Sequence, residues 1–287
     1  MSARAPAHRG PVETLELDRG YVVPRVIVGG WQLSTGHASS PAPRDEIYRV
    51  LARFVEAGLT TFDCADIYGG VEELLGGFRD WYRQRRGASA AAGIQVHTKF
   101  VPDRDELQGI SRAYVERIID RSLRRLRVER LDLVQFHWWD YGVSGYLETA
   151  GWLGELRRAG KIRLLGATNF DTPRFEELLS SGVEFTSHQV QYSVLDRRPE
   201  QGMVDLCARR GIRLLAYGTV AGGFLSERHL GAPEPKGELP NRSLVKYRLI
   251  IDDPTILEHQ HTLGIVGDIW FVGDHDNGDA FRGVELL

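Results

Sequence analysis

This chain of 287 residues is expected to fold as an α/β protein of the (β/α)8 TIM-barrel class. Three observations predict that class. Short β-rich segments alternate with amphipathic segments along most of the chain, and serial alternation indicates a parallel sheet with helical crossovers. Seven such units follow one another without a linker rich in Pro, Gly or Ser. The first strand runs into Gly29-Gly30-Trp31-Gln32, which lacks the Gly-x-Gly-x-x-Gly turn of an open dinucleotide-binding sheet.

Strands are expected where β-branched and aromatic residues cluster between turn signals. Before the barrel, residues 14–17 and 22–26 are expected to form a small hairpin around residues 18–20. The barrel strands are expected at residues 22–29, 59–63, 94–100, 131–137, 162–167, 187–192 and 213–217. Since the class needs eight strands, the barrel is expected to be incomplete at its eighth unit.

Helices are expected where apolar residues recur at helical spacing. They are expected at residues 45–57, 71–84, 111–126, 147–159, 173–180 and 200–210. The first of these helices carries an apolar stripe made of Ile47, Val50, Leu51, Phe54 and Val55. In the third helix, Ser111 is the expected N-cap, and Tyr114, Ile118, Ser122 and Leu126 recur four residues apart. Gly160 is expected to close the fourth helix.

Composition limits the class of function. The chain is 42% hydrophobic and 26% charged, with a formal net charge of −3, so it is expected to bind neither nucleic acid nor an anionic membrane. Its two cysteines, Cys64 and Cys207, do not form a disulfide framework, and its first residues lack an apolar secretory core. No apolar run reaches the roughly 18 residues of a membrane span. A cytoplasmic protein is therefore expected, and its oligomeric state is left open.

Residues able to perform chemistry stand at the strand ends, where barrels of this class place their active sites. They are Asp63 with Tyr68 just beyond it, Lys99, His137, Thr168 with Asn169, Gln189 with Tyr192, and Tyr217. Each alone has a structural explanation: Lys99 could reach solvent, His137 could be a core histidine, and Asn169 could cap a turn. Their joint position on one face of the barrel favours a functional site.

These residues lie in motifs that resemble the aldo-keto reductase family. The matching segments run in family order from about residue 14 to residue 252, and they include "TTFDCADIYGGVEELLG" (60–76), "VHTKF" (96–100), "SLRRLRVERLDLVQFHW" (122–138), "GKIRLLGATNF" (160–170), "HQVQYSVLDRRPE" (188–200) and "GIRLLAYGTVAGGFL" (211–225). The combination of Asp-Cys-Ala-x-x-Tyr with a later lysine and a strand-end histidine is specific. The resemblance implies a barrel that carries out NADP(H)-dependent reduction of an aldehyde or ketone, or the reverse oxidation of an alcohol.

The resemblance implies a catalytic tetrad of Asp63, Tyr68, Lys99 and His137. A free tyrosine has a pKa near 10, so it is a weak acid at neutral pH. The neighbouring Lys99 ammonium is expected to lower that pKa, while Asp63 pairs with Lys99 and holds it in place. His137 is expected to orient the substrate, and Tyr68 to protonate the carbonyl oxygen.

The resemblance also implies the residues that hold the cofactor and substrate. Asn169 and Gln189 are expected to bind the nicotinamide carboxamide, because a side-chain amide offers both a donor and an acceptor, and Thr168 is expected to bind the cofactor beside them. Tyr217 is expected to stack on the nicotinamide ring, with a packed core aromatic as the less favoured alternative. Trp31, Trp138, Trp139 and Tyr141 are expected to line an aromatic substrate pocket, although core packing would give the same pattern. No metal is expected at this site.

The C-terminus departs from the family pattern. The match ends at residue 252, so residues 11–252 are assigned to the barrel, residues 1–10 to a disordered tail and residues 253–287 to an atypical tail. Only residues 264–272 there have a β-like pattern, and acids outnumber bases where a phosphate site is expected. A metal site in the tail is disfavoured, although it contains His259, His261, Asp274, His275 and Asp276.

Two other functions remain open. The tail would suit a pseudoenzyme or a regulatory binding module that keeps the barrel but lacks the adenosine-phosphate site. A metal-dependent barrel hydrolase using His137 and Asp63 is disfavoured, because such sites need several His or Asp ligands and only one histidine stands at a strand end. The identity of the substrate and the direction of the reaction are not given by the sequence.

Overall fold

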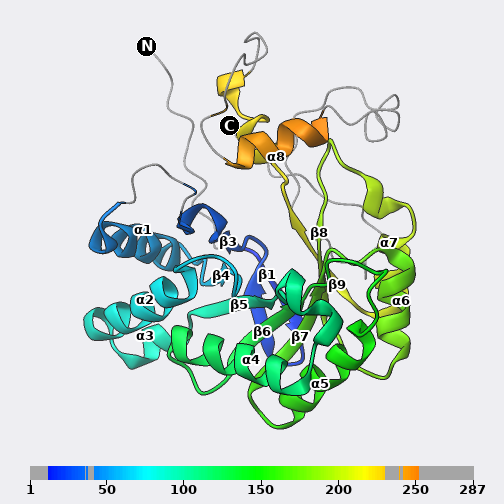
Figure 1. The fold of residues 1–287 in the computed structure, drawn as a ribbon. Coiled ribbons are helices and arrows are strands. Elements are labelled where there is room, and N and C mark those ends of the chain that lie inside the picture. The colour runs from blue at the N-terminus through cyan, green and yellow to red at the C-terminus, as the bar shows by residue number, and fades with distance from the viewer. Residues whose placement is uncertain (1–11, 36, 38–41, 230–238, 240–241, 252–287) are drawn as a thin grey trace.

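The computed structural model describes residues 12–35, 37, 42–229, 239 and 242–251. Its centre is a curled, seven-stranded parallel sheet whose strands follow in chain order (Figure 1). The strands are β3 (Val28–Gly29), β4 (Thr61–Asp63), β5 (Gln95–Phe100), β6 (Leu131–Phe136), β7 (Ile162–Thr168), β8 (Ser187–Gln191) and β9 (Arg213–Tyr217). The predicted α/β barrel class is confirmed, with seven parallel strands in the described part of the chain.

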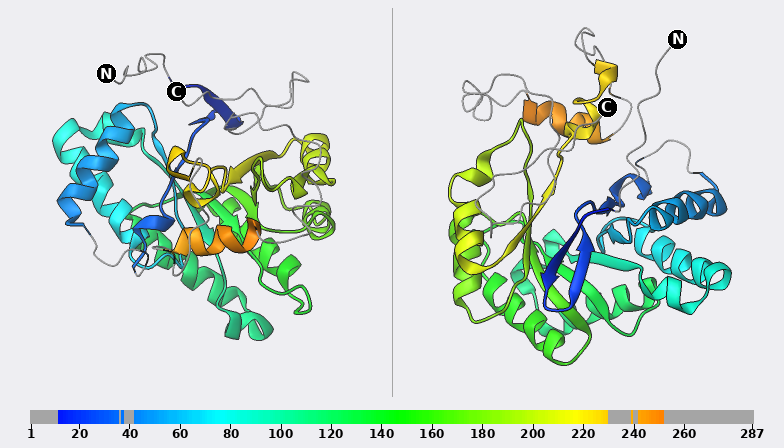
Figure 2. Two further views of the ribbon diagram at one scale, coloured as in Figure 1. Left: turned by 90° about the horizontal axis from the view of Figure 1, so that it is seen from above. Right: turned by 180° about the vertical axis from the view of Figure 1, so that it is seen from behind.

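The connections between strands are helical and cover the outer face of the sheet (Figure 1). They are α1 (Arg44–Glu56), α2 (Val71–Arg86), α3 (Ala88–Ala92), α4 (Arg112–Leu126), α5 (Tyr146–Arg158), α6 (Thr172–Ser180) and α7 (Met203–Arg210). Short 3-10 turns include η1 (Trp31–Leu33), η2 (Arg104–Gly109) and η4 (Ala221–Gly223). The helix α8 (Arg242–Ile251) follows the last strand and lies above the strand ends rather than beside the sheet (Figures 1 and 2).

The N-terminal hairpin closes the bottom of the barrel. Its strands, β1 (Thr14–Asp18) and β2 (Tyr21–Pro24), pair antiparallel and lie close to the sheet in Figure 2. Their buried side chains form a small cluster with barrel residues, and this cluster consists of Leu15, Leu17, Tyr21, Val23, Leu133, Leu164 and Leu215. Burial of these apolar groups closes one end of the barrel, so the candidate site lies at the other end, where the strands end.

One expected strand divides into two. Residues 22–29 do not form a continuous strand, because Tyr21–Pro24 belongs to the hairpin and Val28–Gly29 begins the barrel. Pro24 has no amide hydrogen with which to continue a ladder. Arg25 instead donates its backbone N–H to the Glu13 carbonyl at 2.8 Å, which extends the hairpin and turns the chain.

The helix faces were predicted with mixed success. In α4, Ser111 caps the N-terminus by accepting from the Tyr114 amide at 3.3 Å, and the expected face is buried. In α1 the buried face is instead Tyr48, Leu51 and Ala52, so the expected stripe is wrong at Val50 and Phe54, which are 46% and 36% exposed. Tyr48 contacts the rings of Phe78 and Trp81 on α2, so the face of α1 that carries Tyr48 is the face that is buried.

The sheet has two edge strands among the described residues. β3 and β9 stand at its ends and do not pair with one another. The segment expected to fill this gap, residues 264–272, lies outside the described residues, as do both expected tails. At the upper end, α8 bridges the two sides: Ser243 hydrogen-bonds His37 at 3.1 Å, and Tyr247 packs on Gly218 and Gly222.

Candidate active site

The strand ends surround one cavity of about 590 Å³. The residues expected to act on substrate and cofactor come together there, although they are far apart in the sequence. Those that line the cavity are Trp31, Asp63, Tyr68, Lys99, His137, Trp139, Thr168, Asn169, Gln189 and Tyr217. The expected residues that do not line it are Trp138, Tyr141 and Tyr192.

Asp63 and Lys99 form an ion pair at the bottom of this cavity. Asp63 ends β4 and Lys99 lies near the end of the neighbouring strand β5. Lys99 Nζ lies 2.6 Å from Asp63 Oδ2 and also donates to the Cys64 carbonyl at 2.8 Å. Burial lowers the pKa of Lys99, but Asp63, Tyr68 and Cys64 together raise it by more, so the net shift is upward and Lys99 stays positively charged.

Two glutamines hold the other carboxylate oxygen of Asp63. Gln135 and Gln189 both donate from Nε2 to Asp63 Oδ1, at 2.8 and 2.9 Å. Gln189 therefore contacts the ion pair, in addition to lining the cavity where it was expected to bind the carboxamide. Gln135 was not identified from the sequence, although a glutamine inside the apolar run of β6 was the available signal.

Tyr68 stands above the ion pair on the loop between β4 and α2. Lys99 Nζ lies 5.3 Å from the centroid of its ring. Burial raises the pKa of the Tyr68 hydroxyl, the positive charge of Lys99 lowers it, and Asp63 raises it, with a net upward shift. The hydroxyl therefore carries its proton at neutral pH, and Lys99 is the group that stabilises the anion if that proton leaves.

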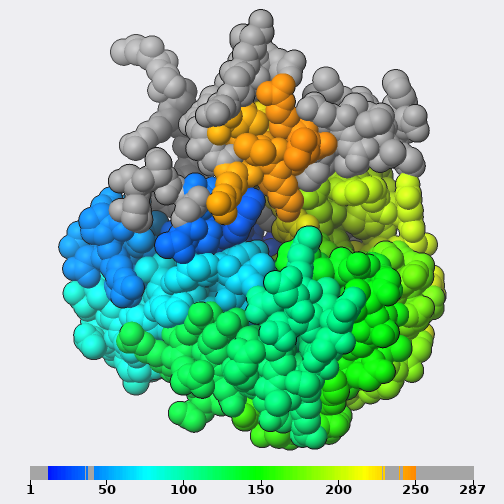
Figure 3. Space-filling model, in the orientation of Figure 1, coloured from blue at the N-terminus to red at the C-terminus, as the bar shows by residue number. Residues whose placement is uncertain are grey.

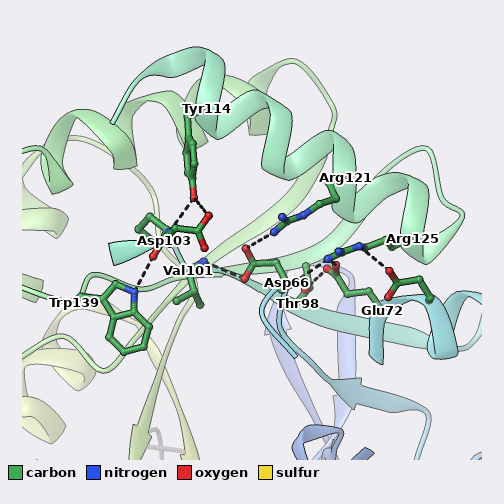
Figure 4. A network of polar contacts seen from close by, with 11 residues as sticks. Asp66, Glu72, Thr98, Val101, Asp103, Tyr114, Arg121, Arg125 and Trp139 are labelled. Carbon is green, nitrogen blue, oxygen red and sulfur yellow. Dashed lines mark hydrogen bonds and ion pairs between the residues drawn. The ribbon is translucent and has the colours of Figure 1, made fainter. Parts of the chain in front are cut away.

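The loop that carries Tyr68 is anchored through Asp66. The Asp66 backbone N–H faces the Lys99 carbonyl at 3.4 Å, and Asp66 Oδ1 accepts from the Val101 amide at 3.2 Å. Arg121 on α4 donates to Asp66 Oδ2 at 3.3 Å (Figure 4). These contacts join the loop to the end of β5, which carries Lys99. Asp66 thus fixes the relative position of Tyr68 and Lys99.

A second buried acid lies beside Asp66 (Figure 4). Glu72 at the start of α2 accepts from Thr98 at 2.7 Å and pairs with Arg125 at 3.3 Å. Arg125 also donates to the Asp66 carbonyl at 3.0 Å. Burial and the negative charge of Glu72 raise the pKa of the Asp66 carboxyl to about 8. Asp66 therefore titrates close to physiological pH.

His137 follows β6 and is held by the neighbouring strand. Its Nδ1 lies 3.2 Å from the Thr168 carbonyl, which can only accept, so Nδ1 carries the hydrogen. Burial lowers the pKa of the His137 ring, which is therefore neutral at pH 7. In that neutral ring Nε2 has a lone pair and accepts a hydrogen bond.

The residues expected to bind the nicotinamide stand at the ends of β7, β8 and β9. Tyr217 donates its hydroxyl to Asn169 Oδ1 at 2.9 Å, and Asn169 adopts a φ of 59°. Burial raises the pKa of Tyr217 to about 12. Thr168 Oγ1 is buried and has no hydrogen-bond partner among the described residues. That hydroxyl is a polar group beside the cavity whose bonding capacity a ligand could use.

The aromatic wall contains Trp139 rather than Trp138. Trp138 is 2% exposed, and its indole nitrogen donates to the Asp140 and Val143 carbonyls at 2.9 and 3.1 Å. Trp139 lines the cavity and is 38% exposed. Its ring centroid lies 4.5 Å from that of the His137 ring, in an edge-to-face arrangement. The expectation for Trp138 is corrected, because the two adjacent indoles point to opposite sides of the chain.

Comparison with known proteins identifies the family. The family model described as "Aldo/keto reductase family" matches residues 25–266. The chain belongs to the aldo/keto reductase family. The matched range of this aldo/keto reductase continues past residue 252, where the motifs recognised in the sequence end.

Curated relatives of this aldo/keto reductase carry several names. It is 33% identical over 206 residues to flagellar radial spoke protein 5 of Chlamydomonas reinhardtii, covering 60% of this chain and 38% of that one. It is 28% identical over 213 residues to the NADH-specific methylglyoxal reductase of Escherichia coli, covering 70% and 65% respectively. The chain thus spans less than two thirds of the length of these relatives.

Solved structures share the fold of this aldo/keto reductase. The holo form of an aldo-keto reductase from Bacillus halodurans superimposes with a TM-score of 0.64 at 29% identity, covering 83% of this chain and 76% of that one. A thermostable aldo-keto reductase in complex with the inhibitor epalrestat gives a TM-score of 0.65 at 25% identity, covering 88% and 100%.

Two further observations concern the described part of the chain. None of its helices combines the length and apolarity that crossing a membrane requires. Within the same residues, no group of three or more His, Cys, Asp and Glu side chains is arranged to hold a metal ion. The tail residues weighed as metal ligands lie outside this part.

Proposed function

We propose that this aldo/keto reductase transfers hydride between NADP(H) and a small aldehyde, ketone or alcohol, with Tyr68 as the general acid and base. One observation carries the proposal: Tyr68 lies over the buried Lys99–Asp63 pair in the same cavity as His137 and the amides of Asn169 and Gln189. A proton donor, a cation that stabilises its anion and groups suited to a carboxamide are the parts that such a reaction needs.

The residues present fit a nicotinamide cofactor. Thr168 Oγ1 is a buried hydroxyl without a partner among the described residues, and the Asn169 and Gln189 amides stand beside it on neighbouring strands. When bound, NADP(H) supplies or accepts the hydride, which no side chain can do. The choice of NADP(H) over NAD(H) rests on the family. Since the E. coli relative is named NADH-specific and a silkworm structural neighbour was solved with NADP, both cofactors belong in the test.

Tyr68 handles the proton at the substrate oxygen. In reduction, its hydroxyl gives a proton to the carbonyl oxygen, and the tyrosinate left behind is stabilised by the Lys99 ammonium. In oxidation, the tyrosinate takes the proton of the alcohol. Asp63 keeps Lys99 charged and in position through the contact of 2.6 Å.

His137 orients the substrate oxygen according to its own protonation. The neutral ring donates from Nδ1 to Thr168, so its Nε2 accepts the hydroxyl hydrogen of an alcohol. To donate to a carbonyl oxygen, the ring must be protonated at both nitrogens. At neutral pH the geometry therefore supports binding of an alcohol hydroxyl by His137, whereas the Tyr68 hydroxyl is the donor to a carbonyl oxygen.

The experiment is a turnover assay with purified protein. NADPH or NADH is mixed with a panel of aldehydes and ketones that includes methylglyoxal, and cofactor oxidation is followed by absorbance, with the Tyr68→Phe variant as control. We expect oxidation that depends on substrate and on Tyr68. Binding of NADPH without turnover of any substrate would instead favour a pseudoenzyme or a binding module. Absence of both binding and turnover would contradict both.

A further inference from the structure

We infer that Lys246 on α8 binds an anionic group of the ligand in the cavity, either a carboxylate on the carbonyl substrate or the diphosphate of the nicotinamide cofactor. The inference rests on the proposed function and adds a ligand class to it. No role was assigned to Lys246 from the sequence, and the surroundings of its side chain point to this class of ligand.

Lys246 reaches the cavity from the element that lies over its mouth. The helix α8 lies above the strand ends, between the N-terminal elements and the β8 side of the molecule (Figure 3). Lys246 Nζ lies 4.6 Å from the ring centroid of Tyr217, 5.3 Å from that of Tyr247 and 5.7 Å from that of Trp31. The ammonium thus stands among three aromatic rings that line the cavity.

The position of α8 is fixed by close packing. A Cβ atom on Gly218 would lie 2.5 Å from the Tyr247 hydroxyl oxygen, and one on Gly222 would lie 2.6 Å from the Tyr247 ring. Both glycines have positive φ values, of 76° and 66°. On the other side, Ser243 bonds His37. The helix is therefore held at both ends of the cavity mouth, and Lys246 projects between these contacts.

Lys246 has no acidic partner among the described residues. No ion pair of the described part includes it, and burial lowers its pKa. Among the described residues that line the cavity, Asp63 is the one carboxylate, and it is already paired with Lys99. By contrast Arg25, another cation of the lining, pairs with Glu13 at 3.3 Å. Aromatic faces stabilise the Lys246 ammonium only in part.

An anion is the ligand group that completes this environment. An ammonium has three donors and no acceptor, and the partial burial of Lys246 limits the water that can bind them. A carboxylate or phosphate oxygen restores those bonds and neutralises the charge. Trp31 is an expected wall of the substrate pocket and Tyr217 the expected platform for the nicotinamide. We therefore expect both ligands to bind close enough to Lys246 Nζ for a hydrogen bond or ion pair.

The test separates the two sources with matched ligands. Lys246→Met removes the charge and keeps the length of the side chain, and Lys246→Arg restores a charge. The control is Lys161→Met, which removes a lysine that pairs with Asp120 outside the cavity. The measurements are the Kd for NADPH by tryptophan fluorescence and the KM for para-carboxybenzaldehyde and for its neutral methyl ester. Thermal melting checks the fold of each variant.

If the anion belongs to the substrate, Lys246→Met should raise the KM for para-carboxybenzaldehyde at least about tenfold. The KM for the methyl ester and the Kd for NADPH should then stay within about twofold of the wild-type values. If it belongs to the cofactor, the Kd for NADPH should rise by that factor. Lys246→Arg should recover most of either loss. The inference fails if Lys246→Met leaves all three values within about twofold, or if Lys161→Met changes them equally.

A separate arm keeps this result distinct from failure of the proposed function. Should the wild-type protein show no turnover, terephthalate and pyrophosphate are titrated against the fluorescence of Trp31 and the other tryptophans. Binding to the wild type that weakens at least about tenfold in Lys246→Gln supports the anion site without any reductase activity. Equal binding by both proteins, or by neither, overturns it.

Discussion

Lys99 Nζ lies 2.6 Å from Asp63 Oδ2, and this contact joins the ends of two neighbouring strands below the Tyr68 ring. Lys99 is buried and Asp63 is mostly buried, and such a pair stabilises only when the remaining donors and acceptors are also satisfied. Here Gln135 and Gln189 donate to the second carboxylate oxygen. The cation below Tyr68 therefore depends on Asp63, Gln135 and Gln189, which come from three other strands.

The first prediction concerns the proton donor. Tyr68→Phe keeps the ring and removes the hydroxyl, so carbonyl reduction should fall by a factor of about 10²–10⁴ with little change in thermal stability. Steady-state kinetics measure the loss. Tyr82→Phe is the matched control, because Tyr82 is a buried tyrosine of α2 outside the cavity. A Tyr68→Phe enzyme within a few-fold of the wild type would remove Tyr68 from the mechanism.

The second prediction concerns the charge below the tyrosine. Lys99 lowers the pKa of Tyr68 against the effect of burial, so Lys99→Met should raise that pKa further. The decline of reduction rate at high pH, where the acid loses its proton, should then move to higher pH, and kcat should fall. Since the variant leaves Asp63 uncompensated, the double change Asp63→Asn with Lys99→Met serves as the folded reference. An unmoved pH profile in both variants would assign the tuning to another group.

The third prediction concerns a glutamine that sequence reasoning missed. Gln135→Leu removes one charge-assisted hydrogen bond to Asp63, which should lower the free energy of unfolding by about 1.5–3 kcal/mol. Urea denaturation measures this loss. Ser187→Ala is the control, because the Ser187 hydroxyl is buried nearby and makes no hydrogen bond with the described residues. Equal effects of the two changes would mean that Gln135 only fills space.

The fourth prediction concerns the pH dependence of stability. The pKa of Asp66 is about 8 in the folded protein and about 3.9 in an unfolded chain, so the folded state holds an extra proton between these values. Stability from this group is complete below about pH 4 and is lost as pH rises through about 8. The slope is at most about 1.4 kcal/mol per pH unit.

Asp66→Asn mimics the protonated acid and should remove this slope. Urea denaturation of the wild type and the variant at intervals from pH 5 to pH 9 is the measurement, with Asp80→Asn as control for a more exposed acid of α2. We expect the wild type to lose stability towards pH 8 while Asp66→Asn stays flat over the same range. Parallel curves would show that Asp66 is ionised throughout.

The fifth prediction separates the two neighbouring indoles. Trp139→Ala should change the KM for carbonyl substrates several-fold with a small effect on stability, because Trp139 lines the cavity and is partly exposed. Trp138→Ala should lower the free energy of unfolding by about 3–5 kcal/mol, because it empties a buried site. Steady-state kinetics and denaturation of both variants test this prediction. If Trp138→Ala changed the KM and Trp139→Ala lowered the stability instead, Trp138 rather than Trp139 would contact the substrate.

Much of the fold followed from local patterns. The alternation of strand and helix, the Ser111 cap and the strand-end positions of Asp63, Lys99 and His137 depend on spacing along the chain. Once the strands are parallel, their ends meet on one face, so residues far apart in sequence reach one cavity. That is why the members of the site were identifiable before any distance was known.

The rest was decided by contacts between distant segments. Trp138 and Trp139 differ only in which way each points beyond the end of β6, and Val50 was misplaced because packing against α2 rotates α1. Gln135 became visible only when its strand was set beside Asp63. The sequence by itself determined the order of the elements and the kinds of chemical group at the strand ends. Only the tertiary structure decided their partners and brought Lys246 over Tyr217, because side-chain direction and long-range packing are not encoded in local spacing.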